Sequence, residues 1–130
     1  DSVNACARLE SLTKYYQVPV LVNKAISDKA NQFDFRWIDR IRVKGKQFAM
    51  DIYQPLQKGS RLAEANLIHL HTEACAAYLQ ANWGKAEQFF EQLSRELPEE
   101  KIYAMYLSRI LNYKQNPPEN WHGIFTHTEK

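Results

Sequence analysis

The sequence has 130 residues, of which 45% are hydrophobic and 12% are aromatic. This composition excludes a disordered protein, and the length fits one domain or a small domain with an appendage. The formal net charge is only +2, which is too small to indicate nucleic acid or a membrane surface as a partner. No apolar stretch approaches the roughly twenty residues that span a bilayer, so we expect no membrane contact by this segment.

The mild positive charge belongs to the first part of the chain. Residues 1–54 carry nine Lys and Arg against six Asp and Glu, while the rest carry eight against nine. Cys6 and Cys75 both lie in alanine-rich apolar surroundings, which suits reduced, buried thiols. We therefore expect a cytoplasmic location, or the cytoplasmic portion of an anchored protein. The chain begins at Asp1 without a methionine, which favours a piece of a longer polypeptide.

The first part of the chain predicts a helix, a strand, a helix and a long strand. Apolar spacing indicates a helix over residues 3–14, a β-branched run indicates a strand over 18–22, and a short helix follows over 23–29. Residues 33–44 then alternate with period 2, which is typical of a strand with two unlike faces. The apolar face is predicted to hold Phe33, Phe35, Trp37, Ile41 and Val43, and the basic face Asp34, Arg36, Arg40, Arg42 and Lys44.

A β-hairpin and three helices are predicted next. Gly45 permits a tight turn at residues 44–47, and the alternation from Phe48 onward predicts the returning strand, which Pro55 should end. We place a domain boundary in the polar connector that follows, so that residues 1–56 form one domain and residues 57–130 a helical one. Amphipathic patterns predict helices over 62–82, 83–97 and 99–114, with Pro98 in the first turn of the third.

The spacing of small and apolar residues in the helical part resembles one tetratricopeptide repeat. In that repeat, small residues let two antiparallel helices pack closely. The match ends near residues 117–118, which favours a helix-hairpin appendage over a true array. The positions that carry the match are Ala74, Ala86, Phe90, Leu93 and Pro98.

Two patterns have the residue types of a phosphate-binding or catalytic site. Asn4 and Arg8 stand one helical turn apart, where an amide and a guanidinium can together bind an oxygen that carries developing charge. Lys44 and Lys46 flank a glycine at the predicted hairpin turn, where open backbone and mobile positive charge suit a triphosphate. Both patterns are also common on solvated surfaces, so neither is specific by itself.

Other candidate sites have weaker support. His71 and Cys75 form an i, i+4 pair that could ligate a metal, with His69 nearby, but no further ligand is suggested there. The alternating aromatic and basic residues of 33–44 could suggest nucleic-acid stacking. Because the aromatic residues share one predicted face, a core-facing strand explains them better, and we expect no nucleic-acid partner.

Two segments taken together resemble a known family. Residues 3–12 read VNACARLESL and residues 38–46 read IDRIRVKGK. In wording, order and separation they are similar to the last two sequence blocks of the class III adenylate/guanylate cyclase catalytic domain. The resemblance implies that Asn4 and Arg8 stabilise the transition state as the ribose 3′ oxygen attacks the α-phosphate. It also implies that Lys44, with Lys46 beside it, contacts the triphosphate of ATP or GTP.

The resemblance continues into the helical part, which is similar to the tail of bacterial cyclases of this class. It implies an α+β fold, with a partial ferredoxin-like cyclase segment of helix, strand, helix and β-hairpin followed by an all-α tail. The residues that carry it are Tyr78, Leu79, Asn82, Trp83, Ala86, Phe89, Phe90, Leu93, Pro98, Tyr106, Leu107, Pro117, Pro118, Trp121, His122 and Gly123.

Parts of the family pattern cannot be placed in this chain. Members carry two aspartates that bind two metal ions, and further residues that recognise the purine. The resemblance therefore implies Mg²⁺ or Mn²⁺ for the intact enzyme, none bound by this fragment, and an inactive isolated chain. It also implies a homodimer, because the active sites form between two catalytic domains. The alternative is a non-enzymatic module, in which the helical hairpin binds a protein partner and the cyclase-like part is a degenerate scaffold.

Overall fold

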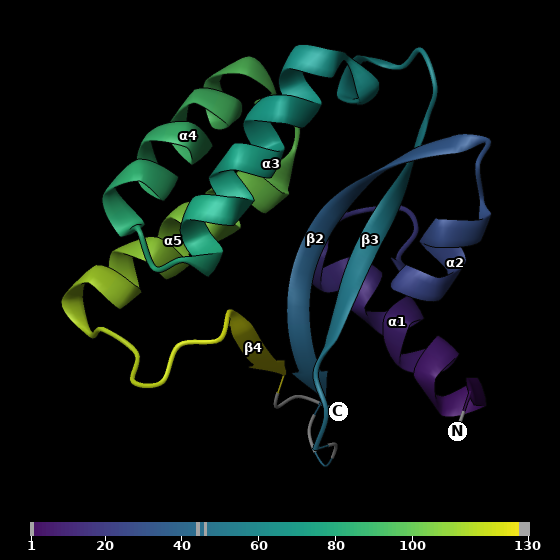
Figure 1. Cartoon of the computed structure of the whole chain (residues 1–130), viewed down its shortest axis with the longest axis horizontal. Coiled ribbons are helices and arrows are strands. Elements are labelled where there is room, and N and C mark those ends of the chain that lie inside the picture. The colour runs from purple at the N-terminus through teal and green to yellow at the C-terminus, as the bar shows by residue number, and fades with distance from the viewer. Residues whose placement is uncertain (1, 44, 46, 128–130) are drawn as a thin grey trace. The chain divides into compact units, whose positions relative to one another are not determined.

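The computed structural model of the chain describes residues 2–43, 45 and 47–127, with side chains from residue 9 onward. Its elements confirm the predicted α+β fold, in which a helix, a strand, a helix and a hairpin precede a run of helices (Figure 1). The elements belong to two compact units. We call Asp1–Ala63 together with Ile124–Lys130 the sheet unit, and Glu64–Gly123 the helical unit.

The sheet unit contains a four-stranded sheet in the order β1-β3-β2-β4. β1 (Val22–Asn23) and β2 (Phe33–Val43) both pair antiparallel with β3 (Met50–Gln57). β4 (Ile124–His127) pairs parallel with the last four residues of β2. Two helices, α1 (Ser2–Tyr16) and α2 (Lys24–Lys29), and a 3-10 turn at Arg61–Ala63 complete the unit, and Figure 1 shows α1 passing behind the hairpin.

The end of α1 explains why the predicted strand over residues 18–22 is largely wrong. Gln17 takes a positive φ of 55°, and the Val18 N–H donates to the Thr13 carbonyl at 3.1 Å, as in a Schellman cap. This cap turns the chain sharply, and Pro19 has no N–H to offer a sheet. Only the two residues of β1 pair with a neighbouring strand in this region. The helices predicted over residues 3–14 and 23–29 are confirmed by α1 and α2.

The predicted hairpin is confirmed, but its second strand is offset. β3 begins at Met50, so Phe48 lies before the strand and is 66% exposed. Pro55 does not end β3, which continues past it and pairs there with β2. β1 pairs with β3 only at Ile52 and Tyr53, so beyond them that edge of β3 tolerates a residue without an N–H.

The predicted division of β2 into an apolar and a basic face is wrong, because the strand contains a β-bulge. The pairing with β3 skips Ile38, between Trp37 and Asp39. An extra residue reverses which side chains point inward, so even-numbered positions are buried before the bulge and odd-numbered positions after it. Arg36 and Ile41 consequently lie on the same buried side of the sheet.

The helical unit confirms the three predicted helices, as α3 (Ala65–Leu79), α4 (Trp83–Glu96) and α5 (Lys101–Gln115). Ala81 has a positive φ of 59° after α3, and the Asn82 N–H donates to the Ala77 carbonyl at 2.9 Å. The Asn82 side chain then accepts a hydrogen bond from the Lys85 N–H and caps α4. Pro98 stands in the turn before α5, not in its first turn as predicted.

The core of the helical unit combines small and aromatic side chains. Ala74 and Ala86 are fully buried, which lets α3 and α4 approach closely. The Phe90 and Tyr106 rings stack with centroids 4.8 Å apart and an interplanar angle of 2°, and Tyr78 meets Tyr106 edge-on at 4.8 Å. The core therefore joins α4 to α5 through Phe90 and Tyr106, and α3 to α5 through Tyr78 and Tyr106.

A segment without helix follows α5 and returns to the end of α3. The Trp121 Nε1–H lies 3.1 Å from the carbonyl oxygens of both Tyr78 and Leu79 at the end of α3, where the Tyr78 oxygen also accepts the Ala81 N–H at 3.1 Å. Gly123, with a φ of 78°, then leads into β4. The sequence did not predict β4. Because β4 joins the same sheet as β2 and β3, the helical unit is inserted in the chain between two strands of one sheet.

Candidate functional site

The four predicted site residues lie in two segments of the sheet unit. Asn4 and Arg8 belong to α1, one turn apart along its backbone, and their side chains lie outside the described part of the chain. Lys44 and Lys46 also lie outside the described residues. Their roles therefore stay predictions.

Gly45, between the two lysines, is described and has a backbone conformation that favours glycine. Its φ of 87° lies in the region that favours glycine, and the residue is exposed. A Cβ placed there would meet no atom within 4 Å, so backbone strain, not crowding, selects glycine.

The arginines that precede this turn are not equivalent. The Arg36 Nε donates to Gln54 Oε1 at 2.9 Å inside the sheet. The Arg40 Nε donates to Asp51 Oδ1 at 3.0 Å. The Arg42 Nε, in contrast, is buried and has no hydrogen-bond partner among the residues that the structure describes. Arg42 is therefore better placed than Arg40 to give its charge to an incoming anion.

A buried polar cluster joins α1, β2 and β4. Tyr16, Asp39 and His127, which we call the Tyr16 cluster, are 1%, 0% and 8% exposed. The Tyr16 hydroxyl donates to Asp39 Oδ2 at 2.5 Å and lies 2.8 Å from His127 Nε2. Because the single phenol hydrogen goes to Asp39, the His127 Nε2–H donates to the phenol oxygen. Asp39 Oδ1 also accepts the Arg40 backbone N–H at 2.8 Å.

Aromatic rings surround the histidine of this cluster. The Tyr15 ring meets the His127 ring edge-on at 4.7 Å, and the Phe125 ring does so at 4.9 Å. Sequence reasoning missed the cluster. The sequence offered little signal for it, because Asp39 is one of several charged residues in its strand.

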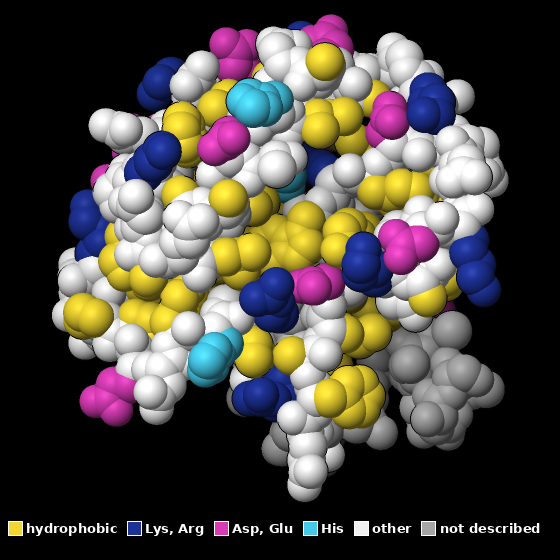
Figure 2. Space-filling model, in the orientation of Figure 1, with side chains coloured by type: hydrophobic (Ala, Val, Ile, Leu, Met, Phe, Trp, Pro, Cys, Tyr) yellow, Lys and Arg dark blue, Asp and Glu magenta, His cyan; other side chains and the backbone are white. Residues whose placement is uncertain are grey.

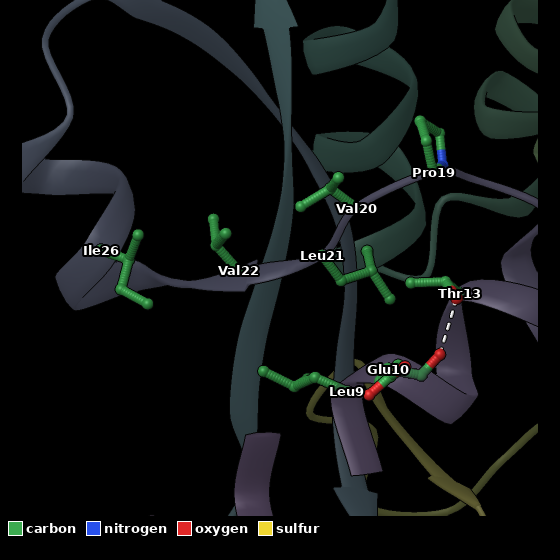
Figure 3. A pocket seen from close by; sticks show the side chains of 8 residues that line it. All are labelled: Leu9, Glu10, Thr13, Pro19, Val20, Leu21, Val22 and Ile26. Carbon is green, nitrogen blue, oxygen red and sulfur yellow. Dashed lines mark hydrogen bonds between the residues drawn. The ribbon is translucent and has the colours of Figure 1, made fainter. Parts of the chain in front are cut away.

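A cavity of about 230 Å³ lies beside α1 (Figure 3). Most of its lining is aliphatic, and the Thr13 hydroxyl that borders it donates to the Glu10 backbone carbonyl at 2.6 Å. An apolar lining offers few hydrogen-bond donors to phosphate oxygens, so this cavity does not suit a triphosphate. The lining residues are Leu9, Glu10, Thr13, Pro19, Val20, Leu21, Val22 and Ile26.

The described residues do not fit a Mg²⁺ or Mn²⁺ site. Within the described ranges, no group of three or more His, Cys, Asp and Glu side chains is arranged to hold a metal ion. Asp39 is held by Tyr16, and Asp51 accepts from both Trp37 Nε1 and Arg40. We therefore assign no metal ligand in this part of the chain.

The histidine and cysteine of the helical unit contact each other and a tyrosine. His71 Nδ1 lies 3.0 Å from the Tyr103 hydroxyl, and His71 Nε2 lies 3.5 Å from Cys75 Sγ. All three side chains are buried, and Cys75 is a thiol.

On the face that Figure 2 shows, acidic, basic and apolar side chains are intermixed over the helices, without a gathering of one charge. None of the helices in the described chain is long and apolar enough to cross a membrane.

The fold and the site together define a mixed α+β protein with a helix, strand, helix and hairpin layout and a glycine turn between two lysines. No family model matches the chain, and no solved structure matches it. The chain is 25% identical over 118 residues to "Adenylate cyclase, terminal-differentiation specific" of Dictyostelium discoideum. The match covers 85% of this chain but spans only 6% of the length of that protein. The similarity supports a cyclase-related chain at the level of a distant, partial relative.

Proposed function

We propose that this chain holds the C-terminal portion of a class III nucleotide cyclase catalytic domain, followed by a tetratricopeptide-like helical tail. The intact protein converts ATP, or GTP, into the cyclic nucleotide and pyrophosphate. The observation that carries the proposal is the similarity to an adenylate cyclase across 85% of the chain. The element order supports it, because α1 and the β2–β3 hairpin place the two cyclase-like blocks in one unit.

Each predicted site residue has a chemical role in this proposal. The Asn4 amide and the Arg8 guanidinium donate hydrogen bonds to oxygens that gain charge as the ribose 3′ oxygen attacks the α-phosphate. Lys44 binds the triphosphate as a mobile cation, with Lys46 beside it. Gly45 supports this role, since its open backbone lets a phosphate approach closely.

The intact enzyme requires contributions beyond these residues. Mg²⁺ or Mn²⁺ supplies Lewis-acid activation in cyclases of this class, and the described residues do not fit such an ion. A second cyclase domain, in a homodimer, completes the site. The isolated chain is accordingly inactive, and the helical tail is available to a protein partner.

The test is cyclic nucleotide production from ATP and from GTP, with Mn²⁺ or Mg²⁺, by the longest natural polypeptide that contains this sequence. We expect Asn4→Ala and Arg8→Ala each to lower kcat by roughly 100- to 1000-fold, as loss of a transition-state donor does. Glu10→Gln, an exposed position of the same helix, is the matched control and should leave kcat unchanged. Rates within about threefold of wild type for both variants, under ~0.7 kcal/mol of barrier, would refute the assigned roles.

A pair of arginine variants tests the phosphate-binding turn independently. Arg42→Gln should raise KM for the nucleotide by about tenfold, because a partly buried guanidinium without a partner at Nε can bind an anion. Arg40→Gln should change KM by less than about threefold, because Asp51 already engages that guanidinium. Equal effects of the two substitutions would contradict this assignment.

The alternative function is a non-enzymatic interaction module on a degenerate cyclase-like scaffold. Under it, the natural polypeptide makes no cyclic nucleotide under any of these conditions. Product formation that depends on Asn4 and Arg8 excludes this alternative, whereas no product from wild type favours it.

A further inference from the structure

We propose that His127 is a positioning residue for the cyclase site. Through the phenol of Tyr16, it holds α1, which carries Asn4 and Arg8, against the end of β2 that leads into Lys44. The effect on catalysis rests on the proposed function. The effect on α1 itself does not, and it can be measured without any activity.

The Tyr16 cluster brings together three elements that are far apart in sequence. The Tyr16–Asp39 hydrogen bond joins residues 23 positions apart, and the contact from Tyr16 to His127 spans 111 positions. In the register of β4 with β2, His127 stands opposite Val43, the residue immediately before Lys44. The last described residue of β4 is therefore beside the strand end that enters the proposed triphosphate turn.

The donors and acceptors of the cluster follow one order, from His127 through Tyr16 to Asp39. The Asp39 carboxylate accepts the phenol hydrogen, so the phenol oxygen must receive its second hydrogen bond from a donor, and His127 Nε2 supplies it. A carboxylate acceptor strengthens such a chain, and burial keeps water from replacing either bond. Replacing His127 with an apolar residue removes this donor from the phenol oxygen in a buried setting.

Because Tyr16 and Arg8 belong to the same helix, the contact between Tyr16 and His127 also affects the position of Arg8. Tyr16 is the last residue of α1, and Arg8 lies eight residues before it, about 12 Å along the helix axis. A tilt of about 5° about the Tyr16 end moves the Arg8 backbone by about 1 Å, and a misplacement of that size can cost about 100-fold in rate. Lys44 follows β2, whose pairing with β3 does not depend on His127.

The key comparison is between His127→Leu and His127→Gln. Glutamine carries an amide N–H donor at a reach similar to that of Nε2, whereas leucine carries none. Thr126→Ala, at an exposed position of the same strand, is the matched control. Tyr16→Phe removes the phenol that links His127 to Asp39, and it should reproduce the leucine variant.

Two measurements are made on the natural polypeptide, below the unfolding temperature of every variant. Hydrogen exchange of the amides of residues 9–16 should accelerate at least tenfold in His127→Leu and Tyr16→Phe. In these two variants kcat should fall at least tenfold, while KM for the nucleotide changes less than threefold. His127→Gln and Thr126→Ala should stay within threefold of wild type in every quantity. The double variant that combines Tyr16→Phe with His127→Leu should be no worse than either single variant, because both substitutions break one chain of hydrogen bonds.

Three results would overturn the inference. Wild-type exchange in α1 of His127→Leu would mean that His127 does not hold the helix. Faster exchange without a loss of kcat would mean that the contact is structural only. Equal losses in the Leu and Gln variants would mean that the hydrogen bond is not responsible. If the wild-type polypeptide makes no cyclic nucleotide, the proposed function fails, and the exchange data still decide whether His127 holds α1.

Discussion

The helical unit and the sheet unit are stabilised by contacts of different sequence range. In the helical unit, each helix packs on the next one along the chain, and the Phe90–Tyr106 stack joins residues of adjacent helices. In the sheet unit, β4 arrives from the far end of the chain, and His127 reaches Tyr16 across 111 positions. The stability of the first unit is therefore local, whereas that of the second depends on its last strand.

The two cores also differ in chemistry. The helical core is mostly aliphatic and aromatic, although it also buries His71 and Arg109, and most of its stability comes from burial and ring packing. The sheet core includes Arg36, Asp39, Gln54 and His127 among its buried side chains. Buried polar groups contribute only when their hydrogen bonds are complete, so the sheet unit, which buries more of them, should be the more sensitive of the two to small chemical changes.

The largest effect should come from ending the chain at Gly123, which removes β4. We expect the sheet unit to lose more than about 5 kcal/mol and with it a cooperative transition, because the Tyr16 cluster and the parallel pairing with β2 are both lost. The helical unit should keep its transition. Differential scanning calorimetry of the full chain and of the shortened chain checks this. If both transitions stay unchanged in the shortened chain, the stability of the sheet unit does not depend on β4.

A large-to-small change in the helical core should be the next largest effect. Phe90 is fully buried and stacked on Tyr106, so Phe90→Ala should cost about 3–5 kcal/mol of unfolding free energy. Leu111→Ala, at a position 54% exposed in the same unit, should cost less than about 1 kcal/mol. Urea titration followed by circular dichroism measures both, and similar costs would mean that the core is not where the structure places it.

A smaller effect tests the segment that follows α5. Trp121→Phe keeps an aromatic ring but removes the indole N–H that lies close to two carbonyls of α3, so we expect a loss of about 1 kcal/mol. Trp83→Phe, in the same aromatic cluster, shrinks a ring without removing those two bonds. The difference between the two urea midpoints isolates the capping contribution. A larger loss for Trp83→Phe would contradict it.

The smallest effect concerns the ionisation of Tyr53 on β3. Burial raises the pKa of this phenol above its usual value of 10.0, and the negative charge of Asp51 raises it further. Its neutral form is favoured in the folded protein, so this contribution to stability is complete below pH 10 and is lost as pH rises through the elevated pKa. The ultraviolet titration of wild type minus that of Tyr53→Phe reports this phenol. A difference midpoint at or below 10 would contradict the direction.

Local pattern predicted most elements of this chain. Period-3.6 spacing located α1 and the three helices of the helical unit, and period-2 spacing located the hairpin around Gly45. The faces of β2 were not predictable in this way, because the bulge at Ile38 reverses the inward side within one strand. Bulges depend on pairing with a partner strand, and an alternating pattern carries no record of them.

Long-range features were the ones that the sequence did not reveal. β4 has only four residues, and its pairing with β2 joins the end of the chain to its middle. The Tyr16 cluster depends on that pairing, so no local window contains its three members. The predicted site residues Asn4, Arg8, Lys44 and Lys46 came from the resemblance of two sequence blocks, and their side-chain geometry lies outside the described residues.

The insertion of the helical unit between β3 and β4 sets an order of events during synthesis. The ribosome releases β3 first, then the roughly 60 residues of the helical unit, and only then β4. At a synthesis rate of about 5–20 residues per second, β4 is made roughly 3–12 seconds after β3. The three helices can pack on one another before β4 is made. Nascent chains should therefore present an open β2 edge during this interval, and a chaperone that shields strand edges would act at this stage.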